Sequence, residues 1–205
     1  MDTKNIVYSR NVVEFVTVAN EFCAFLENCE RHNAKTFVAA SSKILPLLYY
    51  KATLLPATEP VYDEGNEQFV SELDYRLTES KIEYLLGQHN DFLEIYDKRA
   101  DENDGQYTAS IAEYMADVYQ DLKNFTVRYK VGNTDVMNDA LWECSENFRE
   151  YWGTRVVNLI RAFHILEYSN VDLNSIERTD QVSEKNTPAW LANHGQNEDI
   201  NPVDM

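Results

Sequence analysis

The sequence predicts an all-α protein: a single up-and-down helical bundle of about five helices with a long last helix. Apolar residues recur at alternating steps of three and four along five segments, which is the spacing of one helix face. Four of the six glycines stand among polar residues between or after these segments, as in helices joined by loops. A chain of 205 residues is long enough to bury one core and short enough to need only one. We therefore expect a bundle domain over residues 1–169 and a mobile acidic tail over 170–205.

The first two helices are predicted over residues 9–32 and 35–55. The first carries one apolar stripe, formed by Val12, Phe15, Ala19, Phe22, Leu26 and Cys29. The second contains Pro46 within its apolar pattern. Because proline removes a backbone donor and collides with the preceding turn, we expect a kink or a break near residues 42–45.

Two capping boxes mark the starts of the next two helices. Ser80 and Glu83 stand three residues apart before an apolar stripe that runs to residue 96, so this helix should direct His89 inward. Ser110 and Glu113 have the same spacing. The most regular stripe of the chain follows them, at Ile111, Met115, Val118, Leu122, Phe125 and Tyr129.

The last helix is expected over residues 134–168. At 1.5 Å per residue it would be about 50 Å long, so it either overhangs the bundle or bends near Gly153. Beyond Asn170 the periodicity stops, and only Trp190 and Leu191 offer the tail an apolar anchor.

The charge balance narrows the classes of partner. The chain has 35 acidic and 18 basic residues and a formal charge of −17, so its field repels phosphate backbones and anionic lipid surfaces. Basic proteins or metal ions fit this field, and so does a role of the charge in solubility alone. No stretch of about 18 apolar residues and no N-terminal apolar region is present. We expect a cytoplasmic protein without nucleic-acid or membrane partners, and the oligomeric state stays open.

Motifs of several enzyme classes are absent. The chain has no GxGxxG, P-loop, HExxH, GxSxG or paired CxxC, and its three cysteines are expected to be reduced, buried thiols. The stretch around Gly105 resembles a calcium loop, but Ala100 and Ile111 would then stand at ligand positions. No histidine has glutamate three residues before it, as a ferritin-like di-iron site requires. No cofactor is therefore expected.

Carboxylates on the last two predicted helices form the candidate site. Glu113, Asp117 and Asp121 share one helix face, and Asp139 and Glu143 share one on the next helix. If the two helices pack antiparallel, these carboxylates approach across a groove, where repulsion raises a pKa or recruits a cation. The alternative is a solvated face whose charges pair with neighbouring basic residues.

Trp142 does not fall on the main apolar stripe of the last helix. An indole at such a position is covered by another element or marks a contact surface.

Several short stretches of the chain are similar to segments of one known family. They are 117–123 (DVYQDLK), 139–143 (DALWE), Phe148, Trp152-Gly153, Arg161-Ala162 with His164, and 86–93. Together they resemble the bacterial family called domain of unknown function 5063, over roughly residues 10–168. The resemblance implies a helical fold and no known activity. The family often has histidine before Trp-Gly, where this chain has Tyr151, so no role that needs an imidazole there carries over.

Two functions remain. The first is a non-catalytic bundle that binds a protein partner through the face of the last two helices. The alternative is a divalent-metal-assisted or acid/base enzyme whose carboxylate-lined groove lies between those helices. No catalytic residue and no metal ligand is assigned. The candidate binding residues are Asp117, Tyr119, Asp121, Asp139, Trp142, Glu143, Trp152 and Arg161.

Overall fold

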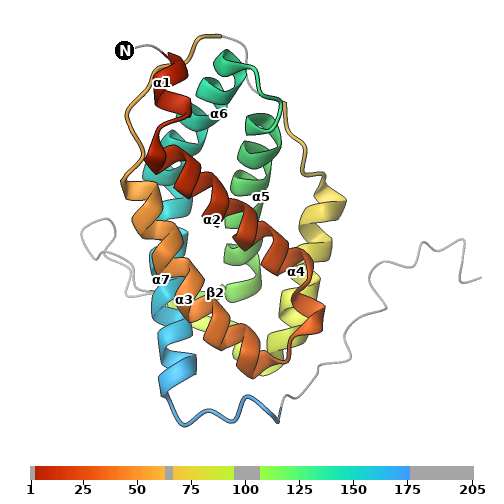
Figure 1. Ribbon diagram of the computed structural model, residues 1–205. Helices are drawn as coiled ribbons and strands as arrows, with labels where there is room; N and C mark the ends of the chain where they lie inside the picture. Colours follow the sequence, from red (N-terminus) through yellow and green to blue (C-terminus); the bar gives the residue numbers. More distant parts are fainter. Residues whose placement is uncertain (1–2, 63–66, 95–106, 176–205) are drawn as a thin grey trace, which may run out of the picture.

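The computed structural model describes residues 3–62, 67–94 and 107–175 as a helical bundle with one small β-hairpin (Figure 1). A π-helical turn, Phe148–Trp152, joins the last two helices into a rod of 35 residues. The predicted all-α bundle with a long last helix is therefore confirmed. In chain order the helices are α1 Thr3–Val7, α2 Arg10–Glu27, α3 Ala34–Thr53, α4 Glu72–Leu86, α5 Ile111–Tyr129, α6 Thr134–Asn147 and α7 Gly153–Tyr168.

Helix α5 is the centre of the bundle. It packs against α2, α4, α6 and α7, and 13 of its 19 residues are buried. Helices α2 and α3 cross one face of the molecule, while α4 and the α6–α7 rod flank α5 (Figure 1). The core includes an aromatic group in which the Phe15 ring lies 5.4 Å from that of Phe125 and stacks on Trp152 at 6.4 Å. The apolar stripe of α5 faces this core, and its other buried positions include the polar residues Asp117, Asn124, Thr126 and Arg128.

The N-cap of helix α4 lies nine residues before the predicted cap at Ser80. Its N-cap is Ser71, whose Oγ accepts from the Asp74 backbone N–H at 3.2 Å, and Asp74 Oδ2 accepts in return from Ser71 N–H at 3.1 Å. The prediction that Ser80 and Glu83 cap this helix was wrong, because the same three-residue spacing occurs again inside it. The helix also ends early, at Gly87, whose positive φ of 52° is open to glycine at little cost.

A β-hairpin takes the place of the predicted end of that helix. Strand β1 (Asp91–Glu94) pairs antiparallel with β2 (Tyr107–Ser110). Asn90 fastens the hairpin to α5, because its Oδ1 accepts from Ala112 N–H at 2.9 Å and its Nδ2 donates to Ser110 Oγ at 3.0 Å. Ser110 Oγ also accepts from Glu113 N–H at 3.1 Å, which confirms the predicted cap of α5.

Two further expectations concern the interiors of helices. Helix α3 continues unbroken through Pro46, so a break is wrong, whereas a kink stays a prediction. Helix α3 packs against both α2 and α7. The long rod does change near Gly153, where the π-helical turn interrupts the α-helix. A π turn adds one residue to a turn of the α-helix. The apolar stripe has a matching feature, because its residues recur in three successive steps of four between Cys144 and Val156 instead of alternating between three and four.

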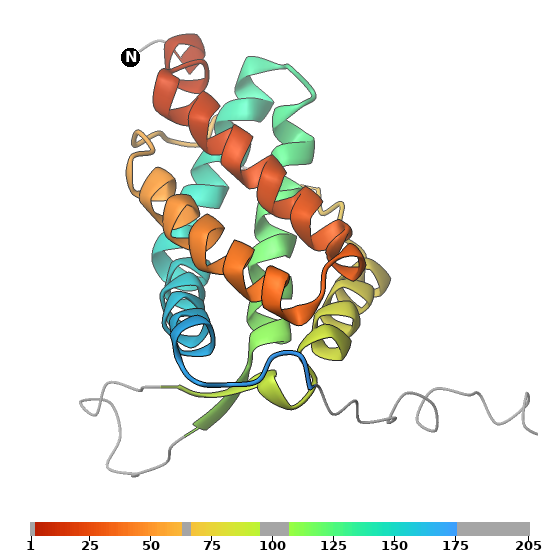
Figure 2. The same ribbon diagram turned by 60° about the horizontal axis from the view of Figure 1, so that its bottom comes forward.

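The chain after α7 stays on the bundle for a few residues. Figure 2 shows residues 169–175 crossing the end of the bundle from α7 towards the turn after α4. Leu173 is buried there, and Gln88 Nε2 donates to the Ser175 carbonyl at 3.0 Å. Most of the predicted tail, including Trp190 and Leu191, lies outside the described residues.

Two expectations from the composition can be compared with the structure. Cys23, Cys29 and Cys144 are free and buried, as the sequence predicted. Within residues 3–62, 67–94 and 107–175, none of the helices combines the length and the apolar character that crossing a bilayer requires.

Candidate functional site

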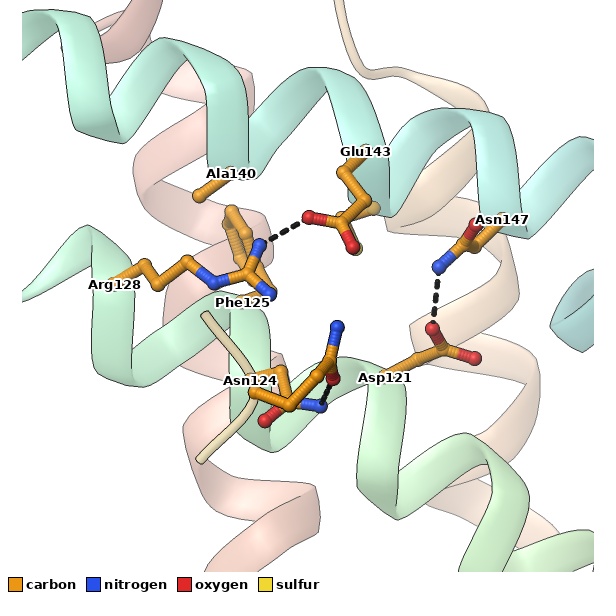
Figure 3. A pocket seen from close by; sticks show the side chains of 9 residues that line it. Asp121, Asn124, Phe125, Arg128, Ala140, Glu143 and Asn147 are labelled. Atoms are coloured by element: carbon orange, nitrogen blue, oxygen red, sulfur yellow. Dashed lines mark hydrogen bonds and ion pairs between the residues drawn. The ribbon is translucent and has the colours of Figure 1, made fainter. Parts of the chain in front are cut away.

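A small polar pocket lies between α5 and α6 (Figure 3). Its volume suffices for about one water molecule. Its polar lining residues are Gln68, Asp121, Asn124, Arg128, Glu143 and Asn147. We call this site the α5–α6 pocket.

Helical spacing brings these side chains together. Asp121, Asn124 and Arg128 follow one another at steps of three and four, so they share one face of α5. Glu143 and Asn147 are one turn apart on α6, which packs against α5. The segment before α4 closes one side of the pocket, because Asn124 Oδ1 accepts from the backbone N–H groups of residues 69 and 70 at 2.7 and 3.0 Å.

Arg128 is the cation of the α5–α6 pocket. Its side chain is only 5% exposed, and its Nη1 donates to the Glu143 carboxylate in a close ion pair. Its Nε donates to the Glu67 carbonyl at 2.9 Å. Its Nη2 is buried and has no hydrogen-bond partner among the described residues. One strong donor of the pocket is therefore unsatisfied.

Asp121 faces the same pocket. Asn147 Nδ2 donates to Asp121 Oδ1 at 2.7 Å. The pKa of Asp121 is raised from 3.8 to about 6, mainly by burial and also by the negative charges of Glu143 and Asp117. The hydrogen bond from Asn147 and the charge of Arg128 oppose this rise and are outweighed. A carboxyl group with this pKa changes charge just below neutral pH.

The raised pKa of Asp121 predicts a specific pH dependence of stability. A carboxyl group whose pKa is higher in the folded state binds its proton more tightly there, so stability falls as pH rises from about 4 to about 6. Between pH 4 and 7 the wild type should lose on the order of 2 kcal/mol relative to Asp121→Asn. Urea unfolding of both proteins across this range checks it, and a constant difference in their free energies of unfolding would contradict the raised pKa.

Cys144 also lines the α5–α6 pocket. Burial raises the pKa of its thiol well above the ordinary value, and the nearby acidic groups act in the same direction. The thiol therefore stays neutral near pH 7 and is a poor nucleophile.

Asp117 lies outside this pocket and is held by two hydrogen bonds and one ion pair. The hydroxyl groups of Tyr75 and Tyr151 each donate to its carboxylate at 2.9 Å, and Arg155 Nε forms an ion pair with it at 3.2 Å. The Arg155 guanidinium in turn lies 3.9 Å from the centre of the Tyr114 ring. These contacts join α4, α5, the π turn and α7, so we interpret Asp117 as a structural clasp.

Two other predicted residues hold distant segments. Tyr119 points towards α2, where its hydroxyl donates to Glu27 Oε1 at 3.1 Å. Asp139 is buried and accepts from the backbone N–H groups of Val61 and Tyr62 at 2.7 and 3.0 Å, which fixes the segment after α3.

The last three predicted residues also lie apart from the pocket. Trp142 is half-buried, on the side of α6 that carries Asn138. Trp152 is fully buried in the core, and its indole N–H donates to the Cys144 carbonyl at 3.1 Å. Arg161 Nη2 donates to the Leu93 carbonyl in the hairpin. Of the eight predicted residues, the structure brings Asp121 and Glu143 together in the α5–α6 pocket.

Sequence reasoning missed four polar residues of the pocket. Asn124 and Arg128 continue the helix face of Asp117 and Asp121, so the extension of this face was the available signal. Asn147 lies one turn after Glu143 and had the same kind of signal. Gln68 precedes α4 in an irregular segment, and no periodicity marks it.

The arrangement does not favour a metal ion. In the described parts of the chain, no three or more His, Cys, Asp or Glu side chains are grouped so that they could hold one. In the α5–α6 pocket, Arg128 already neutralises Glu143 and would repel a divalent cation.

Comparison with known proteins gives one family. The model of the family described as "Domain of unknown function (DUF5063)" matches residues 6–169. The crystal structure of protein BF1032 from Bacteroides fragilis is similar, with a TM-score of 0.73 and 41% sequence identity over 82% of this chain and 98% of that chain. No curated protein matches. The predicted resemblance is thus confirmed, and the chain belongs to the family of the domain of unknown function DUF5063.

Proposed function

We propose that this protein is a non-catalytic interaction module that binds a protein partner at the α5–α6 pocket. The observation that carries the proposal is that the pocket is too small for a typical substrate, although its side chains include charged and polar groups. Pockets for small-molecule substrates usually measure about 300–1,000 Å³, whereas this one has room for about one water molecule. Yet it contains a buried arginine with an unsatisfied donor and a carboxyl group of raised pKa. Such a site fits one small group presented by the surface of another protein.

The charge of the chain supports the same proposal. A net charge of −17 attracts basic surfaces from a distance and speeds their association. We also propose a cytoplasmic location, which three free, buried cysteines support, because reduced thiols are typical of that compartment.

A matched pair of variants tests the proposal. Asp121→Asn removes one carboxylate from the pocket, and Glu113→Gln makes a similar charge change on an exposed position of the same helix. Proteins captured from native cell extract by the tagged full-length chain are quantified by mass spectrometry. A specific partner should be recovered about tenfold less with Asp121→Asn, since a hydrogen bond to a charged group contributes about 1.5–3 kcal/mol. Equal recovery with both variants would contradict docking at this pocket.

Acid–base catalysis by Asp121 is the second candidate. A pKa of about 6 lies near the working pH, which is what a general acid or base requires. The metal-assisted form of this function predicts heat and a melting shift on titration with Mg²⁺ or Mn²⁺. The non-catalytic module predicts neither at millimolar metal.

A further inference from the structure

The hydrogen-bonding groups of the α5–α6 pocket define the chemistry of its ligand. On one side stands the unpaired Nη2 donor of Arg128, a side chain more than nine-tenths buried. On the other sides stand the carboxyl groups of Asp121 and Glu143, and Figure 3 shows the Arg128 guanidinium directed into the space between α5 and α6. A ligand must therefore accept one hydrogen bond and donate another.

Hydrogen bonding excludes one class of charged ligand, and charge excludes another. An ammonium group would donate to the carboxylates, but it has no acceptor and would leave Nη2 unsatisfied. A carboxylate would accept from Nη2, but it would face the negative charges of Asp121 and Glu143. A neutral group that both donates and accepts avoids both conflicts.

Size selects among the neutral groups. The pocket has room for about one water molecule, so a hydroxyl oxygen fits it better than a carboxamide. A hydroxyl keeps the acceptor capacity and one of the two donors of a water molecule, so it can replace a water that accepts one hydrogen bond and donates one. The side chains of Asp121, Glu143 and Asn147 are only partly buried, which leaves the pocket accessible from the surface.

We infer that the α5–α6 pocket binds the hydroxyl group of a serine or threonine side chain of the protein partner. The inference rests on the proposed function, because it names the group by which that partner is anchored. The hydroxyl accepts from Arg128 Nη2 and donates to the carboxyl group of Asp121.

Three small probes test this chemistry without the partner. Methanol, methylammonium chloride and sodium formate are titrated separately into the ¹⁵N-labelled full-length protein at pH 7.5. Methanol should shift the side-chain amide signals of Gln68 and Asn147 saturably, while the amide of Asn28, on an exposed part of the chain, serves as the control. Asp121→Asn should reduce this methanol shift by at least half. A saturable response to methylammonium or to formate instead, or to none of the probes, would overturn the inference.

The probe titrations test the hydroxyl inference, and the capture experiment tests the proposed function, so the two claims can be contradicted independently. If partner recovery depends on Asp121 but methanol causes no saturable shift, the hydroxyl inference is overturned and the proposed function stands. If methanol binds but recovery is the same for Asp121→Asn and Glu113→Gln, the pocket chemistry stands and the proposed function is overturned.

Discussion

Replacement of Gly153 by alanine should destabilise the protein by about 3 kcal/mol. A Cβ atom at this position would lie 2.3 Å from the Phe148 carbonyl oxygen and 3.0 Å from two carbons of the Phe148 ring. The π turn brings that carbonyl close, and a backbone atom cannot move aside as a flexible side chain can. Helix propensity alone predicts the opposite sign, since alanine is favoured over glycine by about 1 kcal/mol inside a helix.

Gly132→Ala is the matched control. Gly132 has a φ of 78° and nothing within 4 Å of the Cβ position, so only the left-handed backbone opposes the change. We expect a loss of about 1 kcal/mol there. Urea unfolding measures both variants. If Gly153→Ala is as stable as the wild type, the close approach at the π turn is wrong.

Loss of the Asp117 carboxylate should cost a similar amount, about 3 kcal/mol for Asp117→Ala. The change leaves two tyrosine hydroxyls without their acceptor and the half-buried Arg155 without its ion-pair partner. Because these three residues come from α4, the π turn and α7, we expect one cooperative unfolding transition at a lower midpoint, measured by circular dichroism.

Two control variants distinguish the loss of all the Asp117 contacts from the loss of one hydrogen bond and from a change at an exposed position. Tyr75→Phe removes a single hydrogen bond to Asp117 and should cost about 1 kcal/mol. Glu113→Ala, on an exposed position of the same helix, should change stability by less than about 0.5 kcal/mol. An Asp117→Ala variant no less stable than Tyr75→Phe would rule out the clasp.

Local patterns predicted the elements whose packing is regular. The stripe of α5 and the cap at Ser110 were readable because one helix face and one side chain decide them. The start of α4 was not, because Ser71 and Ser80 each stand three residues before an acidic residue, and this spacing alone does not decide which of them caps the helix. The hairpin was missed because strand pairing depends on residues far apart in the chain, such as Phe92 and Ala109.

The site was predictable only where its residues share a helix face. Asp121 and Glu143 meet because α5 and α6 are adjacent helices whose acidic faces approach each other. The roles of Asp117 and Asp139 depend on Tyr75 and on residues 61–62, which come from other segments. Helical periodicity gives no information about partners from other segments. The sequence therefore predicted that Asp117 and Asp139 line the same groove as Asp121 and Glu143.

Site-specific photo-crosslinking tests the central claim, that a partner docks at the α5–α6 pocket. Benzoylphenylalanine replaces Glu150, an exposed residue about one turn after Asn147, or Tyr50, an exposed residue of α3. Irradiation of native cells should give a discrete cross-linked protein from position 150 and none from position 50, and Asp121→Asn should remove the product. The same product from both positions, or a product that Asp121→Asn leaves unchanged, would contradict docking at this pocket.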